Sequence, residues 1–200
     1  MLEKCKIIVE GEGENLDFKV IKKLTKEFSE KYNLCITPSK GFNEMKESLV
    51  KISPSNLRYL LVIVDADEEN IEKRFEEIKN KFNKNKFNIP IKIGSIDCND
   101  SEKINLGIFL LPNNKDKGSM DTLVYSALKN SSEKFKSCVK LHRECFKKNG
   151  LKKGTENQED KFNLRSIMAG LIYKNERQTK FIDFGNRNFE DLKKFLRQVK

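Results

Sequence analysis

The sequence predicts an α/β fold with a mostly parallel sheet, helices on both of its faces and a helical C-terminal third. Short apolar runs rich in β-branched residues alternate with amphipathic helical patterns as far as Leu111. The apolar run that ends at Val64 is continuous, which is typical of a parallel strand buried on both faces. Beyond Leu111 the longer apolar patterns have helical spacing, so the last third is expected to be helical.

The first half of the chain divides into three strands and three helices. Strands are assigned to β-branched runs, and helices to apolar residues spaced three or four apart, such as Phe42, Met45 and Leu49. In order, the predicted elements are a strand over Lys6–Val9, a helix from Asp17 to about Lys31 with Asp17 as its cap, a strand over Leu34–Thr37, a helix over Gly41–Ile52, a strand over Arg58–Val64 and a helix over Glu68–Phe82.

The second half begins with strands and ends with helices. Ile89–Ile96 is a fourth strand or an edge piece, because Pro90 cannot donate to a ladder of hydrogen bonds. The remaining predictions are a buried strand over Leu106–Leu111, helices over Ser119 to about Lys129, Ser132 to about Lys147, Lys161–Tyr173 and Phe189–Val199, and a short apolar piece over Phe181–Phe184. No repeat or low-complexity linker interrupts this order, so residues 1–200 are predicted to form one domain.

Charge and composition narrow the function classes. The chain has 40 Lys and Arg against 30 Asp and Glu, a net charge of +10, which favours a polyanionic partner such as nucleic acid. A Lys-rich coding bias is an equally weighted alternative. Apolar stretches stay far below the roughly 20 residues of a membrane-spanning helix, and no secretory signal pattern follows Met1, so we expect no membrane association and a cytoplasmic location. Five irregularly spaced cysteines indicate reduced thiols.

Acidic residues follow two of the predicted strands. Glu10 comes directly after the first strand, and Asp65 and Asp67 follow the apolar strand that ends at Val64. Ligands bind beyond the carboxyl ends of parallel strands, and carboxylates gathered there repel one another unless a cation lies between them. The strand period of two would place Asp65 and Asp67 on one side. The pattern predicts an Mg²⁺ or Mn²⁺ site, and the alternative is that each acid merely caps the helix after it.

These residues resemble a Toprim domain, the metal-binding fold shared by topoisomerases, bacterial-type primases and OLD-type nucleases. The resemblance consists of a strand that runs into Glu10 and a later apolar strand that runs into Asp65-x-Asp67. Glu10 and Glu14 fit the acid pair of the OLD-like branch, in which Asp is usual at the second position. The stretch from Gly107 through Leu-Pro-Asn-Asn to an acid at position 121 is similar to a compact single-domain group related to the OLD-type nucleases.

The resemblance implies metal-dependent hydrolysis of phosphodiesters in DNA or RNA. It implies that Glu10, Asp65 and Asp67 bind a first cation. Glu14 and Asp121 would contribute to a second cation, and Glu is commoner at the position of Asp121 in the compact group. Lys161 and Arg165 would stabilise the negative charge of the transition state. OLD-like domains commonly work with an ATPase partner protein. The alternative from another class is a non-catalytic Toprim-like module that binds nucleic acid or a protein. The sequence leaves the oligomeric state open.

Two cysteines and the histidine of the chain form a second candidate metal motif. Cys138, His142 and Cys145 lie four and then three residues apart, on one face of a predicted helix. Two thiolates and an imidazole could hold zinc, but the sequence offers no fourth ligand beside them. Ordinary packing of the cysteines is therefore the favoured interpretation.

Overall fold

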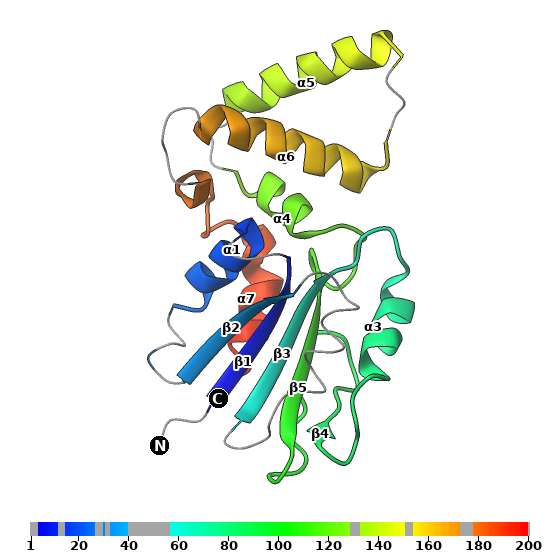
Figure 1. Ribbon diagram of the computed structural model, residues 1–200, viewed down its shortest axis with the longest axis vertical. Coiled ribbons are helices and arrows are strands. Elements are labelled where there is room, and N and C mark those ends of the chain that lie inside the picture. Colours follow the sequence, from blue (N-terminus) through cyan, green and yellow to red (C-terminus); the bar gives the residue numbers. More distant parts are fainter. Residues whose placement is uncertain are drawn as a thin grey trace.

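The sheet of this protein has five strands, and every neighbouring pair in it is parallel (Figure 1). A computed structural model describes residues 4–11, 15–26, 30, 33–39, 57–128, 133–150, 154–172 and 178–199. The strand order is β2-β1-β3-β5-β4. The strands are β1 (Lys4–Glu10), β2 (Asn33–Ser39), β3 (Leu57–Asp65), β4 (Phe87–Asn88) and β5 (Ile104–Leu111).

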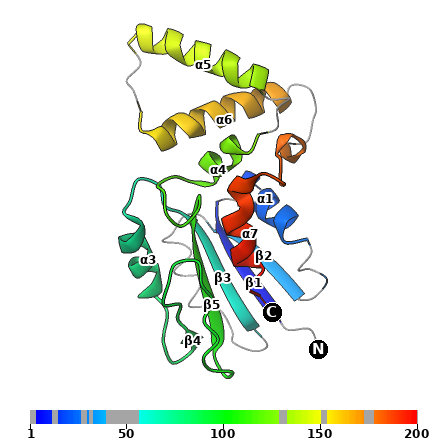
Figure 2. The same ribbon diagram turned by 180° about the vertical axis from the view of Figure 1, so that it is seen from behind.

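Helices cover both faces of the sheet and make up most of the C-terminal part (Figures 1 and 2). The described α-helices are α1 (Leu16–Leu24), α3 (Ile71–Lys79), α4 (Met120–Ser126), α5 (Glu133–Lys148), α6 (Glu156–Ile172) and α7 (Glu190–Leu196), with 3₁₀ turns at Gln178–Phe181 and Arg187–Phe189. The predicted α/β class is confirmed, and the arrangement is consistent with a Toprim-like fold.

The core has two layers because successive side chains of a strand point to opposite faces. Leu61 and Ile63 of β3 belong to the cluster that α1 and α7 cover, in which Phe195 packs against Phe109. Leu60, Val62 and Val64 belong to the cluster that α3 covers with Ile71, Phe75 and Ile78. This two-sided burial explains the continuous apolar run that predicted β3.

Three helices, α4, α5 and α6, lie beyond the carboxyl ends of the strands (Figures 1 and 2). Contacts join α6 to both α4 and α5. At the interface between α5 and α6, Glu159 forms ion pairs with Arg143 at 2.8 Å and with Lys147 at 3.2 Å. The packing therefore holds α6 above the edge of the sheet where the acidic residues were predicted to gather.

Several predicted boundaries were wrong. Helix α1 is capped by Asn15, whose Oδ1 accepts the backbone N–H of Phe18 at 2.9 Å, and the expected cap, Asp17, lies in its first turn. Likewise α3 begins after Asn70 instead of at Glu68. Helix α6 begins five residues earlier than predicted, at Glu156.

The strand predicted over Ile89–Ile96 does not form. In this region the strand that pairs with β5 is β4, Phe87 and Asn88, and Ile96 makes only an isolated antiparallel bridge to Gly107 of β5. Pro90 has no N–H to donate, the N–H of Ile91 is bound by the Asp97 carboxylate at 2.8 Å, and Gly94 turns the chain at a φ of 74°. The helix predicted over Gly41–Ile52 lies outside the described residues.

Across the described ranges, the structure contains no helix with both the length and the apolar character needed to cross a membrane.

Candidate functional site

Glu10 and Asp65 meet where β1 and β3 end. The two strands are adjacent and parallel, with Val9 paired to Ile63, so their final residues lie side by side. Glu10 Oε2 accepts the backbone N–H of Asp65 at 3.2 Å, and Asp65 Oδ1 accepts the backbone N–H of Met120, the first residue of α4, at 2.9 Å. The structure thus brings together the two acids that the strand ends predicted to converge.

Asp67 joins this group by a different route from the predicted one. Strand β3 ends at Asp65, and Asp67 adopts a φ of 51°, so the strand period of two does not apply to the pair. Two backbone hydrogen bonds with Gly118, of 2.7 and 2.8 Å, hold Asp67 in this conformation. Its Oδ1 accepts from Lys161 Nζ at 2.9 Å and from Asn157 Nδ2 at 3.2 Å. Lys161, predicted to meet phosphate charge, is therefore an immediate neighbour of the acids.

Asn157 is a functional candidate that the sequence did not reveal. It is buried near the start of α6, and its Oδ1 accepts from Ser119 Oγ at 2.8 Å and Thr122 Oγ1 at 3.2 Å. The same side chain donates to Asp67. The Asn157 amide therefore connects α6 to α4 and to the loop after β3. The sequence did not reveal it because α6 was predicted to begin at Lys161, after Asn157.

A second group of charged residues lies next to the first. Asp17 from α1, Asp121 from α4 and Arg165 from α6 line a cavity of about 260 Å³. Asp17 is the second residue that the sequence analysis missed, because it was interpreted as a helix cap. An acid in the first turn of the helix that follows a strand ending in Glu10 was the available signal. Glu14, predicted to accompany Asp121, lies outside the described residues.

Burial and mutual repulsion make these carboxyl groups weak acids. Burial, followed by the charges of Asp121 and Glu10, raises the pKa of Asp17 to about 7. Burial and the charge of Asp17 raise the pKa of Asp65 well above its ordinary value. Burial also raises the pKa of Glu10 and of Asp121. Removing water from several acids at once therefore favours their protonated forms, and a nearby positive charge would stabilise their ionised forms.

Lys161 and Arg165 supply part of this positive charge. Burial alone would lower the pKa of the Lys161 ammonium, but its hydrogen bond to Asp67 and the charges of Asp67, Asp65 and Asp121 outweigh burial, so the pKa is raised. The charges of Arg165 and Lys161 act against burial at Asp121 and lower its pKa. We call these seven side chains the strand-end cluster: Glu10, Asp17, Asp65, Asp67, Asp121, Lys161 and Arg165.

The donor chemistry of the strand-end cluster suits a hard divalent cation, since its acids offer only oxygen ligands. The hydrogen bonds described above use Oε2 of Glu10 and Oδ1 of Asp65 and Asp67, and leave the other oxygen of each carboxylate outside these contacts. Within the ranges that the structure describes, however, no three Asp, Glu, His or Cys side chains are arranged to hold a metal ion. Several of these carboxylates would therefore have to rearrange before three of them could meet at one ion.

The same finding applies to the alternative zinc motif. Cys138 and Cys145 are exposed thiols on α5, and they do not form a metal-binding group with His142.

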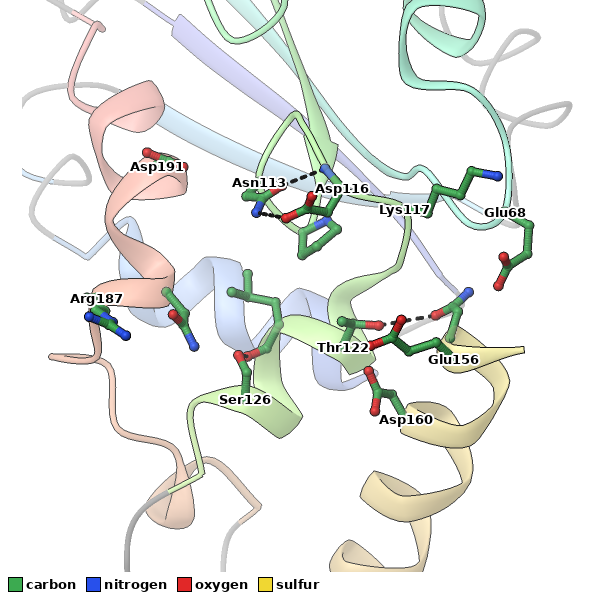
Figure 3. Close-up of a pocket in the computed structure, with 14 residues that line it drawn as sticks. Glu68, Asn113, Asp116, Lys117, Thr122, Ser126, Glu156, Asp160, Arg187 and Asp191 are labelled. Carbon is green, nitrogen blue, oxygen red and sulfur yellow. Dashed lines mark hydrogen bonds between the residues drawn. The ribbon is translucent and has the colours of Figure 1, made fainter. Parts of the chain in front are cut away.

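An acidic groove lies on another side of α6. It encloses about 750 Å³ and is lined by five acidic side chains, Glu68, Asp116, Glu156, Asp160 and Asp191, against two basic ones, Lys117 and Arg187 (Figure 3). Asn157 lines the groove and also contacts Asp67 of the strand-end cluster. The acidic groove therefore reaches the strand-end cluster through Asn157.

Fold and site together define an α/β protein that carries clustered carboxylates and two basic side chains beyond the carboxyl ends of a parallel sheet. A protein-family model described as "Protein of unknown function (DUF3226)" matches residues 4–200, and the chain belongs to this family. Neither the curated proteins nor the solved structures yielded a match to the chain.

Proposed function

We propose that this chain is a Toprim-like phosphodiesterase that cleaves nucleic acid, DNA or RNA, with Mg²⁺ or Mn²⁺. The observation that carries the proposal is the contact between Glu10 and Asp65 at the ends of neighbouring strands, with Asp67 bound to Lys161 beside them. Structural acids seldom accumulate in a buried, mutually repulsive group, and perturbed pKa values of this kind are commonest at functional sites.

In this proposal the acids divide between two cation positions. Glu10, Asp65 and Asp67 hold one ion, and Asp121 contributes to a second with Asp17 beside it, while Glu14 keeps its role from the resemblance. Paired divalent cations would stabilise the attacking and the leaving oxygen of an in-line displacement. The acids come from β1, α1, the end of β3 with the loop after it, and α4, so the packed elements hold the backbones that carry them close together before a ligand arrives.

Lys161 and Arg165 bind the scissile phosphate. Both side chains lie on α6 beside the acids, and the Lys161 ammonium stays protonated because the carboxylates raise its pKa. When Asp67 turns toward an ion, Lys161 loses its present partner and is free to donate to a non-bridging phosphate oxygen. Arg165 can donate from the side of Asp17 and Asp121. A cytoplasmic location and an ATPase partner belong to the same proposal, the latter from the resemblance alone.

The test is cleavage of single-stranded, double-stranded and plasmid substrates with Mg²⁺ or Mn²⁺. Asp65→Asn is the variant of choice because an amide keeps the shape of the side chain and the bond to Met120 N–H but removes the ligand charge. We expect at least a 100-fold loss of rate, on the order of an essential electrostatic group. Glu72→Ala, at an exposed acid on α3, is the control and should cut like wild type. Cleavage that survives Asp65→Asn would rule out the proposed site.

One observation favours a second candidate, a non-catalytic module that binds nucleic acid or a protein. Asp67 is already satisfied by Lys161 and Asn157, so the cluster is internally neutralised in part. If wild type cuts no substrate with either ion, yet binds nucleic acid equally well in EDTA, the binding module replaces the enzyme.

A further inference from the structure

The face of α6 beside the strand-end cluster forms a basic hollow of about 550 Å³. The described residues that line it are Gln158, Lys161, Phe162, Arg165, Ser166 and Ala169. Their spacing of three, one, three, one and three residues places them on one side of the helix, whereas Glu156, Asn157 and Asp160 face the acidic groove. The two openings are thus separated by the helix itself.

Phe162 presents an aromatic ring in this hollow. Its side chain is 36% exposed, and it lies within one helical turn of both Lys161 and Arg165. A surface phenylalanine flanked by cations is a poor contributor to a core, but it combines the two features that sequence-tolerant recognition of a single strand uses: a flat ring for a base and positive charge for the backbone.

The basic hollow connects directly to the strand-end cluster. Arg165 lines both the hollow and the cavity that contains Asp17 and Asp121. Lys161 lines the hollow and donates to Asp67. A phosphate bound by these two cations is therefore adjacent to the acids, and the nucleotide next to it along the chain is within reach of Phe162.

Charge decides which opening a nucleic acid uses. Both charged side chains among the described residues that line the basic hollow, Lys161 and Arg165, are positive, whereas the acidic groove presents five carboxylates against two cations. A polyanion is therefore favoured at the hollow, and the divalent cations of the proposed function would offset the five acids of the strand-end cluster beside it. The ring decides which form of nucleic acid fits, because the faces of paired bases in a duplex are already stacked and cannot lie on Phe162.

We propose that the substrate is single-stranded nucleic acid, which enters through the basic hollow with a base stacked on Phe162 and its phosphates on Lys161 and Arg165. The inference rests on the proposed function in taking nucleic acid as the ligand, and it adds the strandedness, the route of entry and the residue that selects it.

The experiment measures binding without cleavage. Fluorescence anisotropy at fixed salt, with Ca²⁺ in place of Mg²⁺ or Mn²⁺ so that the acids have a cation while cleavage is suppressed, compares a labelled oligothymidylate with a fully paired duplex of similar length. We expect Phe162→Ala and Phe162→Leu to weaken binding of the single strand about 5-fold to 100-fold, as the loss of one base–aromatic stack does. Phe162→Tyr, which keeps a ring, should bind within about 2-fold of wild type. Ile91→Ala removes another exposed apolar side chain, far along the chain from α6, and should have no effect.

Three outcomes would overturn the inference: wild type that does not bind the single strand, Phe162→Leu that binds it like wild type, or equal losses for single strand and duplex. Phe162→Leu keeps the apolar volume, so a folding defect of Phe162→Ala does not remove the test. Cleavage assays separate the two proposals. Asp65-dependent cutting of duplex that ignores Phe162 would overturn this inference alone, and Phe162-dependent binding without any cutting would overturn the enzyme alone.

Discussion

Burial and the charges of Asp121 and Glu10 raise the pKa of the Asp17 carboxyl group to about 7, so this group titrates near neutral pH. In the unfolded chain the same group titrates near 3.8. A pKa raised on folding gives stability that is fully present below about pH 4 and is lost as pH rises through about 7. Asp17 therefore makes the protein less stable on the alkaline side of neutrality.

Asp17→Asn should remove this loss. We expect the free energy of unfolding of wild type to fall between pH 5 and pH 8, and Asp17→Asn to reduce that fall by at most about 2.6 kcal/mol, the part of the shift from 3.8 to about 7 that is lost in this pH range. Urea titrations at the two pH values measure it, with Asp116→Asn at an exposed acid as the control. An unchanged pH dependence in Asp17→Asn would show that other acids govern it.

Individual site residues were predictable to the extent that strand ends determine them. Glu10 and Asp65 follow apolar strands, and parallel strands must finish at a common edge, so their meeting could be inferred. Asp67 was found for the wrong reason, since its left-handed backbone comes from the bridge to Gly118, a contact between residues far apart in sequence. Asp17 was misinterpreted because Asn15, two residues earlier, competes successfully for the capping position.

At the level of elements, the junction of α4 and α6 depends on Asn157. Its amide satisfies Ser119, Thr122 and Asp67 in a buried position. Asn157→Ala leaves these groups without that partner, so we expect a loss of about 1–3 kcal/mol in the free energy of unfolding. Asn188→Ala, at an exposed amide in the acidic groove, should change it by less than about 0.5 kcal/mol. Chemical denaturation measures both, and equal effects would contradict the assigned role.

Central elements were predicted better than peripheral ones. Strands β1, β3 and β5 are short buried runs rich in β-branched and other apolar residues, and all three were located within a few residues. Strand β4 is two residues long and depends on one neighbour, so its pattern was too weak to identify. The start of α6 was missed because Thr155 and Gln158 cap it reciprocally, through hydrogen bonds of 3.1 and 3.3 Å, in a stretch that looked like a polar break.

For the molecule as a whole, the proposed cation sites predict a stability that depends on Mg²⁺. A ligand at 100 times its dissociation constant stabilises the folded state by about 2.7 kcal/mol, which raises the melting temperature of a chain of this size by roughly 5–10 °C. Protons compete for the same carboxylates, so the increase should be larger at pH 8 than at pH 5. Differential scanning calorimetry measures it, and an increase retained in Asp65→Asn would place the ion elsewhere.

Net charge alone would not have revealed the two openings. The excess of ten positive charges averages over a molecule in which an acidic groove and a basic hollow lie on different sides of one helix. This partition depends on how α6 packs over the sheet, and a misplaced helix start in the sequence analysis hid it.

The Lys161 ammonium lies among the acids and provides a positive charge that is part of the chain itself. The chain can therefore fold this region without a bound metal ion. Under the proposed function a metal ion would compete with this ammonium for Asp67, a competition that disfavours singly charged ions.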